Sequence, residues 1–198
     1  MGLDISVLVT EWEPAVAAYR AAGGLDFYWN ANVARNERFY AGDQGDDLPE
    51  LPYLDEWEVM GGQSSFRYPC DSWDHLRAYV PDGLRASLDT AFGAVLPGDF
   101  VDWIPDERDD LSLDAGIAGD SSGALYYSMR PATAKAIAAI EIPWDELDRL
   151  SELHPVPEDN PDHQYLHADA IQWAAGTHLR AVAEAAALGR GVIGILSH

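Results

Sequence analysis

The alternation of apolar and polar side chains predicts a strand at the start of the chain, over residues 3–9 (LDISVLV). Apolar and polar residues alternate at first, and the residues that follow them are all apolar. This pattern is typical of a strand with at least one buried face. Thr10 follows, with Glu13 three residues later and a proline next to it. This spacing is a capping box, so we expect a helix that Thr10 caps and that ends at Gly23 and Gly24.

The next stretches show weaker periodicity. Residues 25–40 are rich in aromatic side chains but follow no clean period, so the pattern favours neither helix nor strand. Residues 42–58 hold seven carboxylates, two prolines and no basic residue, which predicts a solvated acidic loop. A second acidic loop is expected at 99–120, where eight carboxylates accompany Arg108 alone.

Two helices are expected between these acidic stretches. Phe66 and Tyr68 favour a short strand, and Asp71 then caps a helix through Tyr79. Pro81 separates this helix from a second one, which ends near residue 97. Apolar residues of the second helix recur at helical spacing at Leu84, Leu88, Ala91 and Val95.

The last third of the chain gives the clearest pattern. Residues 124–129 read as a strand, and two helices follow at 131–140 and 143–153, each opened by a proline. A long helix is expected over 161–188, stopped by glycine, with a terminal strand over 192–196.

Strands separated by helices need one shared sheet to satisfy their backbone groups. We therefore expect a single α+β domain over 1–198, with acidic loops near 42–58 and 99–120. Its small mixed sheet would include the N- and C-terminal strands, packed against several helices and a long C-terminal helix.

In the C-terminal part of the chain, a strand leads through Met129-Arg130-Pro131 into paired short helices, and the sequence GVIGIL follows at 191–196. With these features the chain resembles the YfbM-like bacterial family of unknown function. The resemblance covers mainly the last 75 residues and the first strand. The resemblance implies the fold and carries no catalytic residue.

Composition narrows the classes of partner. The 198 residues include 34 acidic and 12 basic side chains, a formal net charge of −22. So large an acidic excess argues against proteins that neutralise nucleic-acid phosphates or bind anionic lipid, so we expect no nucleic acid and no membrane among the partners.

Targeting signals and cysteine content point to the cytoplasm. Cys70 is the only cysteine, so no disulfide can form within the chain. The chain starts without a signal-peptide pattern, and no apolar run reaches the length of a bilayer span. We therefore expect a cytoplasmic protein, and the usage of arginine over lysine favours a bacterial one.

Histidines in the predicted long helix form the sharpest candidate for chemistry. Behind an Asn160 cap, His163 and His167 are four residues apart, which places two imidazoles on one helix face, as in helical zinc sites. Gln164 occupies the position where a metalloprotease has its general base, and His178 is too far along the helix to join them. No cofactor is predicted outright, and zinc at His163 and His167 is the candidate. The simpler interpretation is that these histidines pack against the core.

Tryptophans beside acidic residues form the second candidate site. Aromatic rings flanked by carboxylates suit a partner's arginines and lysines, although large rings also commonly cover a small core. The candidate binding residues are Trp57, Trp103, Asp109, Asp110 and Trp144.

Two functions remain open on the sequence. The charge imbalance favours a binding module for a basic protein, for example an immunity-type inhibitor of a cationic toxin. The alternative is a small metal-dependent hydrolase that uses His163, His167 and nearby carboxylates. No complete catalytic pattern is present, so we expect a binding protein rather than an enzyme.

Overall fold

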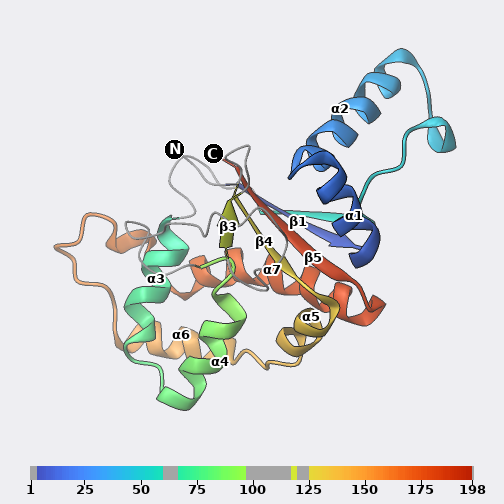
Figure 1. The fold of residues 1–198 in the computed structure, drawn as a ribbon. Helices are drawn as coiled ribbons and strands as arrows, with labels where there is room; N and C mark the ends of the chain where they lie inside the picture. Colours follow the sequence, from blue (N-terminus) through green and yellow to red (C-terminus); the bar gives the residue numbers. More distant parts are fainter. Residues whose placement is uncertain (1–3, 60–66, 97–116, 120–124, 198) are drawn as a thin grey trace.

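The computed structural model describes residues 4–59, 67–96, 117–119 and 125–197 (Figure 1). Five strands form one sheet in the order β2-β1-β5-β4-β3. Its strands are β1 (Asp4–Thr10), β2 (Asp55–Val59), β3 (Ile117–Gly119), β4 (Leu125–Met129) and β5 (Gly191–Ser197). All four strand pairings are antiparallel, so the sheet is antiparallel where a mixed one was predicted. The α+β class and the joining of N- and C-terminal strands are confirmed.

The helices lie on both faces of this sheet. They are α1 (Trp12–Ala22), α2 (Asp26–Ala41), α3 (Arg67–Arg77), α4 (Asp82–Phe92), α5 (Pro131–Ala138), α6 (Trp144–Leu153) and α7 (Ala168–Leu188). Two short 3₁₀ helices are η1 (Gly45–Asp47) and η2 (His163–Tyr165). Helices α1 and α2 pack on one face, and the core on the other face is built with α3 to α7. No helix within the described ranges is long and apolar enough to cross a membrane.

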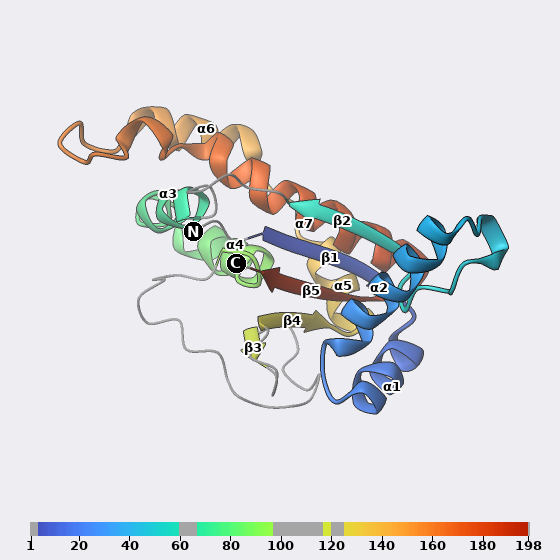
Figure 2. The ribbon, with the colours of Figure 1, turned by 90° about the horizontal axis from the view of Figure 1, so that it is seen from above.

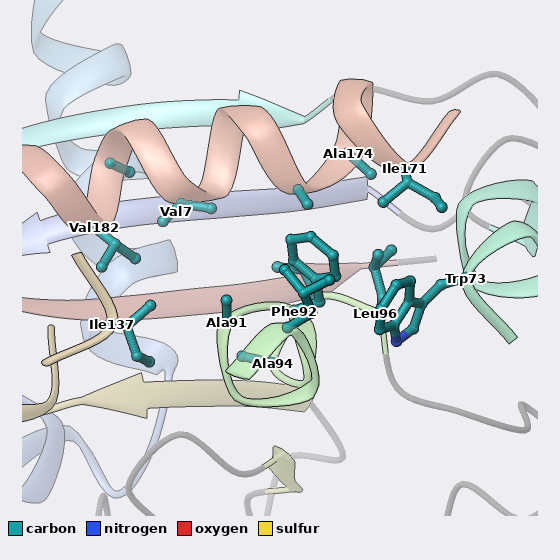
Figure 3. Packing of buried hydrophobic residues seen from close by; sticks show 14 of the residues in the cluster. Val7, Trp73, Ala91, Phe92, Ala94, Leu96, Ile137, Ile171, Ala174 and Val182 are labelled. Carbon is teal, nitrogen blue, oxygen red and sulfur yellow. The ribbon is translucent and has the colours of Figure 1, made fainter. Parts of the chain in front are cut away.

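The larger core lies on the α7 face of the sheet. Figure 3 shows Phe92 of α4 in this core, with Ile171 of α7 on one side of it and Val7 of β1 and Val182 of α7 on the other. All four of these side chains are fully buried. Alternate residues of β1 therefore face α7, while Leu8 belongs to the smaller core under α1 and α2.

Strand β2 corrects the prediction of a solvated loop at 42–58. It forms one edge of the sheet and pairs with β1, with Val7 opposite Trp57 and Val9 opposite Asp55 (Figure 2). An edge strand tolerates charges that a central strand does not, because one side of it faces solvent. The acidic composition of β2 therefore did not indicate a strand.

Two helix starts in the first half of the chain differ from the predictions. Thr10 does not cap α1, since it is the last residue of β1 and the cap position is Glu11, without a side-chain hydrogen bond. Helix α3 begins at Arg67, so Tyr68 is helical rather than in a strand, and Asp71 lies inside the helix. Phe66 lies outside the described residues. The second helix of this region, α4, is confirmed after Pro81.

The long helix begins later in the sequence than predicted. Helix α7 begins at Ala168, seven residues after the predicted start. Asn160 does not cap α7, whose cap position is His167. Its side chain instead accepts a hydrogen bond from the backbone N–H of Asp162 at 2.9 Å, which closes a local turn. The end is confirmed, because Gly189 adopts a left-handed conformation with φ 65° and terminates the helix.

Candidate functional site

The candidate site is a projecting segment, which we call the arm: helix α2 and residues 42–54 that return from it to β2. Only the first turn of α2 is anchored, with Phe27 and Tyr28 buried against the smaller core. Beyond this turn the helix extends away from the sheet, and the return segment runs beside it (Figure 1). The arm therefore presents most of α2 to solvent.

Two tyrosines and one carboxylate join the arm to the sheet. The Tyr28 hydroxyl donates to Oε1 of Glu56 at 2.6 Å, and the Tyr53 hydroxyl donates to Oε2 of the same carboxylate at 2.8 Å. The Tyr53 hydroxyl also lies 3.2 Å from Oδ1 of Asn32 on α2. Burial, with the hydrogen bond to Glu56, raises the pKa of Tyr28 to about 12. Both tyrosines therefore remain neutral donors, and Glu56 of β2 fixes where the arm leaves the body.

The return segment satisfies both arginines of α2. The Arg35 guanidinium donates to the carbonyl oxygen of Pro49 at 2.8 Å. Arg38 forms an ion pair with Asp43, just after the helix. The positive charges of the arm are thus turned toward its own loop.

Large apolar side chains are exposed on the same helix. Trp29 is 42% exposed, Val33 and Phe39 are each 56% exposed, and Tyr40 is 85% exposed. Single exposed apolar residues are ordinary, but four on one projecting helix form a patch typical of an interaction site.

Exposed carboxylates also lie on the arm. Glu37 lies on α2, and Asp46, Asp47 and Glu50 lie on the return segment, all exposed. Within the described part of the chain none of the four forms an ion pair. The arm therefore combines apolar surface with uncompensated negative charge.

A groove of about 810 Å³ lies at the base of the arm. Pro14 and Ala18 of α1 form one wall, Ala31 and Arg35 of α2 form another, and residues 50–54 close it. This volume is sufficient for one or two side chains of a partner.

Two of the predicted binding residues, Trp57 and Trp144, lie away from the arm. Trp57 donates its Nε1–H to Oε2 of Glu184 at 2.8 Å, and the Arg180 guanidinium lies 5.8 Å from its ring centroid. Trp144 stacks on Phe92 with 5.8 Å between ring centroids. Both tryptophans are half-buried and pack against the larger core, which supports the simpler interpretation for them.

Trp144 also lines a second, smaller cavity. It has a volume of about 350 Å³, lies between α5, α6 and α7, and includes Arg180 and Gln172 among mainly apolar walls. Trp103, Asp109 and Asp110, the other predicted binding residues, lie outside the described residues.

The helical histidine pair predicted as a metal site does not form. His163 lies in η2 and His167 is the extended residue before α7, so the two do not share a helix face. Both side chains are exposed, and Nδ1 of His163 lies 2.9 Å from the carbonyl oxygen of Asn160. Among the described residues no group of three or more histidine, cysteine or acidic side chains could hold a metal ion.

The sequence contained one usable signal for the arm. Trp29, Val33 and Tyr40 are separated by four and seven residues, which is helical spacing. Phe27, Tyr28 and Phe39 lie on other faces and obscure it, so 25–40 showed no single apolar face.

Searches against protein-family models, curated proteins and solved structures find no match for this chain. The resemblance to the YfbM-like family stays a prediction from the sequence.

Proposed function

We propose that this chain is a protein-binding module that recognises a basic partner through the arm. The observation that carries the proposal is the exposed apolar face of α2, with Tyr40 85% exposed, on an arm that also holds the unpaired carboxylates Glu37, Asp46 and Asp47. Aromatic anchors supply most of the affinity of protein interfaces, and surrounding charges select the partner. An immunity-type inhibitor of a cationic toxin is one protein of this class.

The net charge of −22 supports the same proposal. A strongly acidic protein attracts a basic partner over distances of about 10 Å at moderate salt and accelerates its association. The arm projects from the body, so a partner can reach it without displacing any part of the core (Figure 1).

Photo-cross-linking in the source cells tests the proposal. A photoreactive amino acid at Val33 should yield an adduct with a basic protein, and one at Leu153, which is 58% exposed on α6, should not. Raising the salt concentration from about 0.05 to 0.5 M in a lysate should reduce the adduct strongly, because the attraction is screened.

Tyr40→Ser provides a second test, because it removes one exposed ring without altering a buried contact. The Val33 adduct should decrease in this variant. Equal adducts from Val33 and Leu153, or an adduct that neither salt nor Tyr40→Ser weakens, would disprove the proposal.

A further inference from the structure

We infer that the partner contributes an amphipathic basic helix, which lies along α2 in the manner of a two-helix coiled coil. The inference rests on the proposed function and specifies how the arm recognises its partner. Four residues carry it, which we call the seam: Trp29, Val33, Asn36 and Tyr40.

The seam residues are separated by four, three and four positions. At about 100° per residue, this spacing keeps all four within about 60° of one another around α2. They extend over about 16 Å, or three helical turns. An alternation of three and four residues is the pattern by which one α-helix packs lengthwise against another at a small crossing angle.

Part of the circumference of α2 is covered by the protein itself. Arg35 contacts Pro49 and Arg38 pairs with Asp43, so the return segment lies on the side of the helix opposite the seam. Asn32, which lies beside Tyr53, flanks the seam. Phe27 and Tyr28 hold the first turn against the sheet. The seam itself is exposed, so a partner can contact three turns of α2 along it.

A helix fits this face better than an extended peptide. Strand addition requires a neighbouring strand edge with unpaired backbone groups, whereas the backbone of α2 is bonded within the helix. Side chains therefore have to provide the contact, and a helix presents its side chains at the same three- and four-residue spacing as the seam.

Charge identifies the partner helix as basic. Glu37 follows Asn36 and flanks the seam at a position where coiled coils place interhelical ion pairs. Arg38 is already paired with Asp43, so the unpaired charge next to Asn36 is the negative charge of Glu37. A second copy of this chain would bring the same charge of −22 and the same Glu37, which disfavours self-association.

Asn36 gives the seam specificity. A polar side chain at one core position of a helix pair selects the register and the partner that offers it a hydrogen bond, at some expense of stability. We expect a polar residue of the partner helix opposite Asn36.

A cross-linking scan of α2 tests this inference. A photoreactive residue is placed singly at each position from 29 to 40 in the full chain, and adducts are quantified from lysate of the source cells. Yields should reach maxima at 29, 33, 36 and 40 and minima at 31, 35 and 38. The partner residues identified by mass spectrometry should be three or four apart and accompanied by lysine or arginine.

The outcomes separate the inference from the proposed function. Uniform adduct yields along α2 would overturn the inference that the partner contributes a helix, while the proposed function stands. Cross-linked partner residues that are two positions apart in the partner's sequence would have the same consequence. No adduct at any of these positions would overturn both. Adducts that contain only two copies of this chain would overturn the basic partner in favour of self-association.

A pair of charge variants provides a matched control. Glu37→Lys and Glu141→Lys change the net charge equally, but Glu141 is an exposed residue after α5, outside the arm. Glu37→Lys should reduce the yield at position 33 about 10-fold, and Glu141→Lys less than about 2-fold. Equal reductions would show that only the total charge matters and would overturn the pairing of Glu37 with a basic helix.

Discussion

The hydroxyl of Tyr127 on β4 lies 2.8 Å from Nδ1 of His178 on α7, and both side chains are completely buried. This hydrogen bond joins the long helix to β4, which lies between β5 and β3 in the sheet. Burial lowers the pKa of His178 to about 3, so the imidazole is neutral in the folded chain. Its Nε2 is buried without a hydrogen-bond partner among the described residues.

We predict that His178 makes folding sensitive to mild acid. The unfolded imidazole has a pKa near 6.5 and the folded one near 3, so only the unfolded chain gains a proton between these values. The contribution of His178 to stability is constant above pH 6.5 and is lost as the pH falls from there towards 3. The loss should be about 2 kcal/mol at pH 5.

Urea unfolding of the wild type and His178→Phe at pH 7.5 and pH 5 measures this contribution. The variant should lose the part of the pH dependence that His178 causes. Tyr127→Phe is the control, because it removes the hydrogen bond but retains the titrating imidazole. Identical pH dependence in the wild type and His178→Phe would contradict the prediction.

We predict that Gly194→Ala destabilises the sheet. A Cβ at Gly194 of β5 would lie 1.9 Å from Cε1 of Tyr127, which is its paired residue on β4. The Tyr127 ring would have to leave its position and with it the hydrogen bond to His178. We expect a loss of about 2–4 kcal/mol in the free energy of unfolding. Gly83→Ala on α4 is the control, since nothing lies within 4 Å of a Cβ there.

We predict that Glu56→Gln loosens the arm. A neutral amide cannot replace both charge-assisted hydrogen bonds from Tyr28 and Tyr53, and we expect a loss of about 1–3 kcal/mol. Hydrogen exchange of α2 should become faster, while that of α7 stays unchanged. Glu58→Gln, an exposed neighbour on the same strand, should leave both unchanged. Unaltered exchange of α2 in Glu56→Gln would show that Glu56 does not hold the arm.

We predict that Tyr40→Ser separates binding from stability. Tyr40 is 85% exposed, so the free energy of unfolding should change by less than about 0.5 kcal/mol. Partner affinity should fall by a factor of about 10 or more if Tyr40 anchors the partner. A large loss of stability in urea unfolding would instead show that the ring packs within the folded chain.

Local signals in the sequence were sufficient for β1, β5 and the end of α7. Each of these depends on neighbouring residues alone: continuous apolar runs for the strands, and Gly189 in a left-handed conformation for the helix end. The sharp turn at Gly189 is sterically easy only for glycine, so its position could be predicted.

Elements that depend on distant residues could not be predicted in the same way. Strand β2 is acidic and forms because β1 offers it an edge, not because its own pattern is apolar. The start of α7 was misplaced because the Asn160 side chain closes a turn on Asp162, which competes with a helix. The bond between Glu56 and Tyr28 joins residues 28 positions apart, so no local pattern reveals the base of the arm.

The order of the strands also governs when the protein can fold during its synthesis. Strand β5 follows the other four described strands in the sequence, yet it lies between β1 and β4 and pairs with both. Until residues 191–197 have been translated, β1 with β2 and β4 with β3 are separate pairs with no hydrogen bond between them. Before β5 is available, the two pairs lack the strand that joins them, and the apolar faces that it completes stay exposed to chaperones and proteases. The final seven-residue pairing of β1 with β5 must close a loop of nearly the whole chain, which is a slow step.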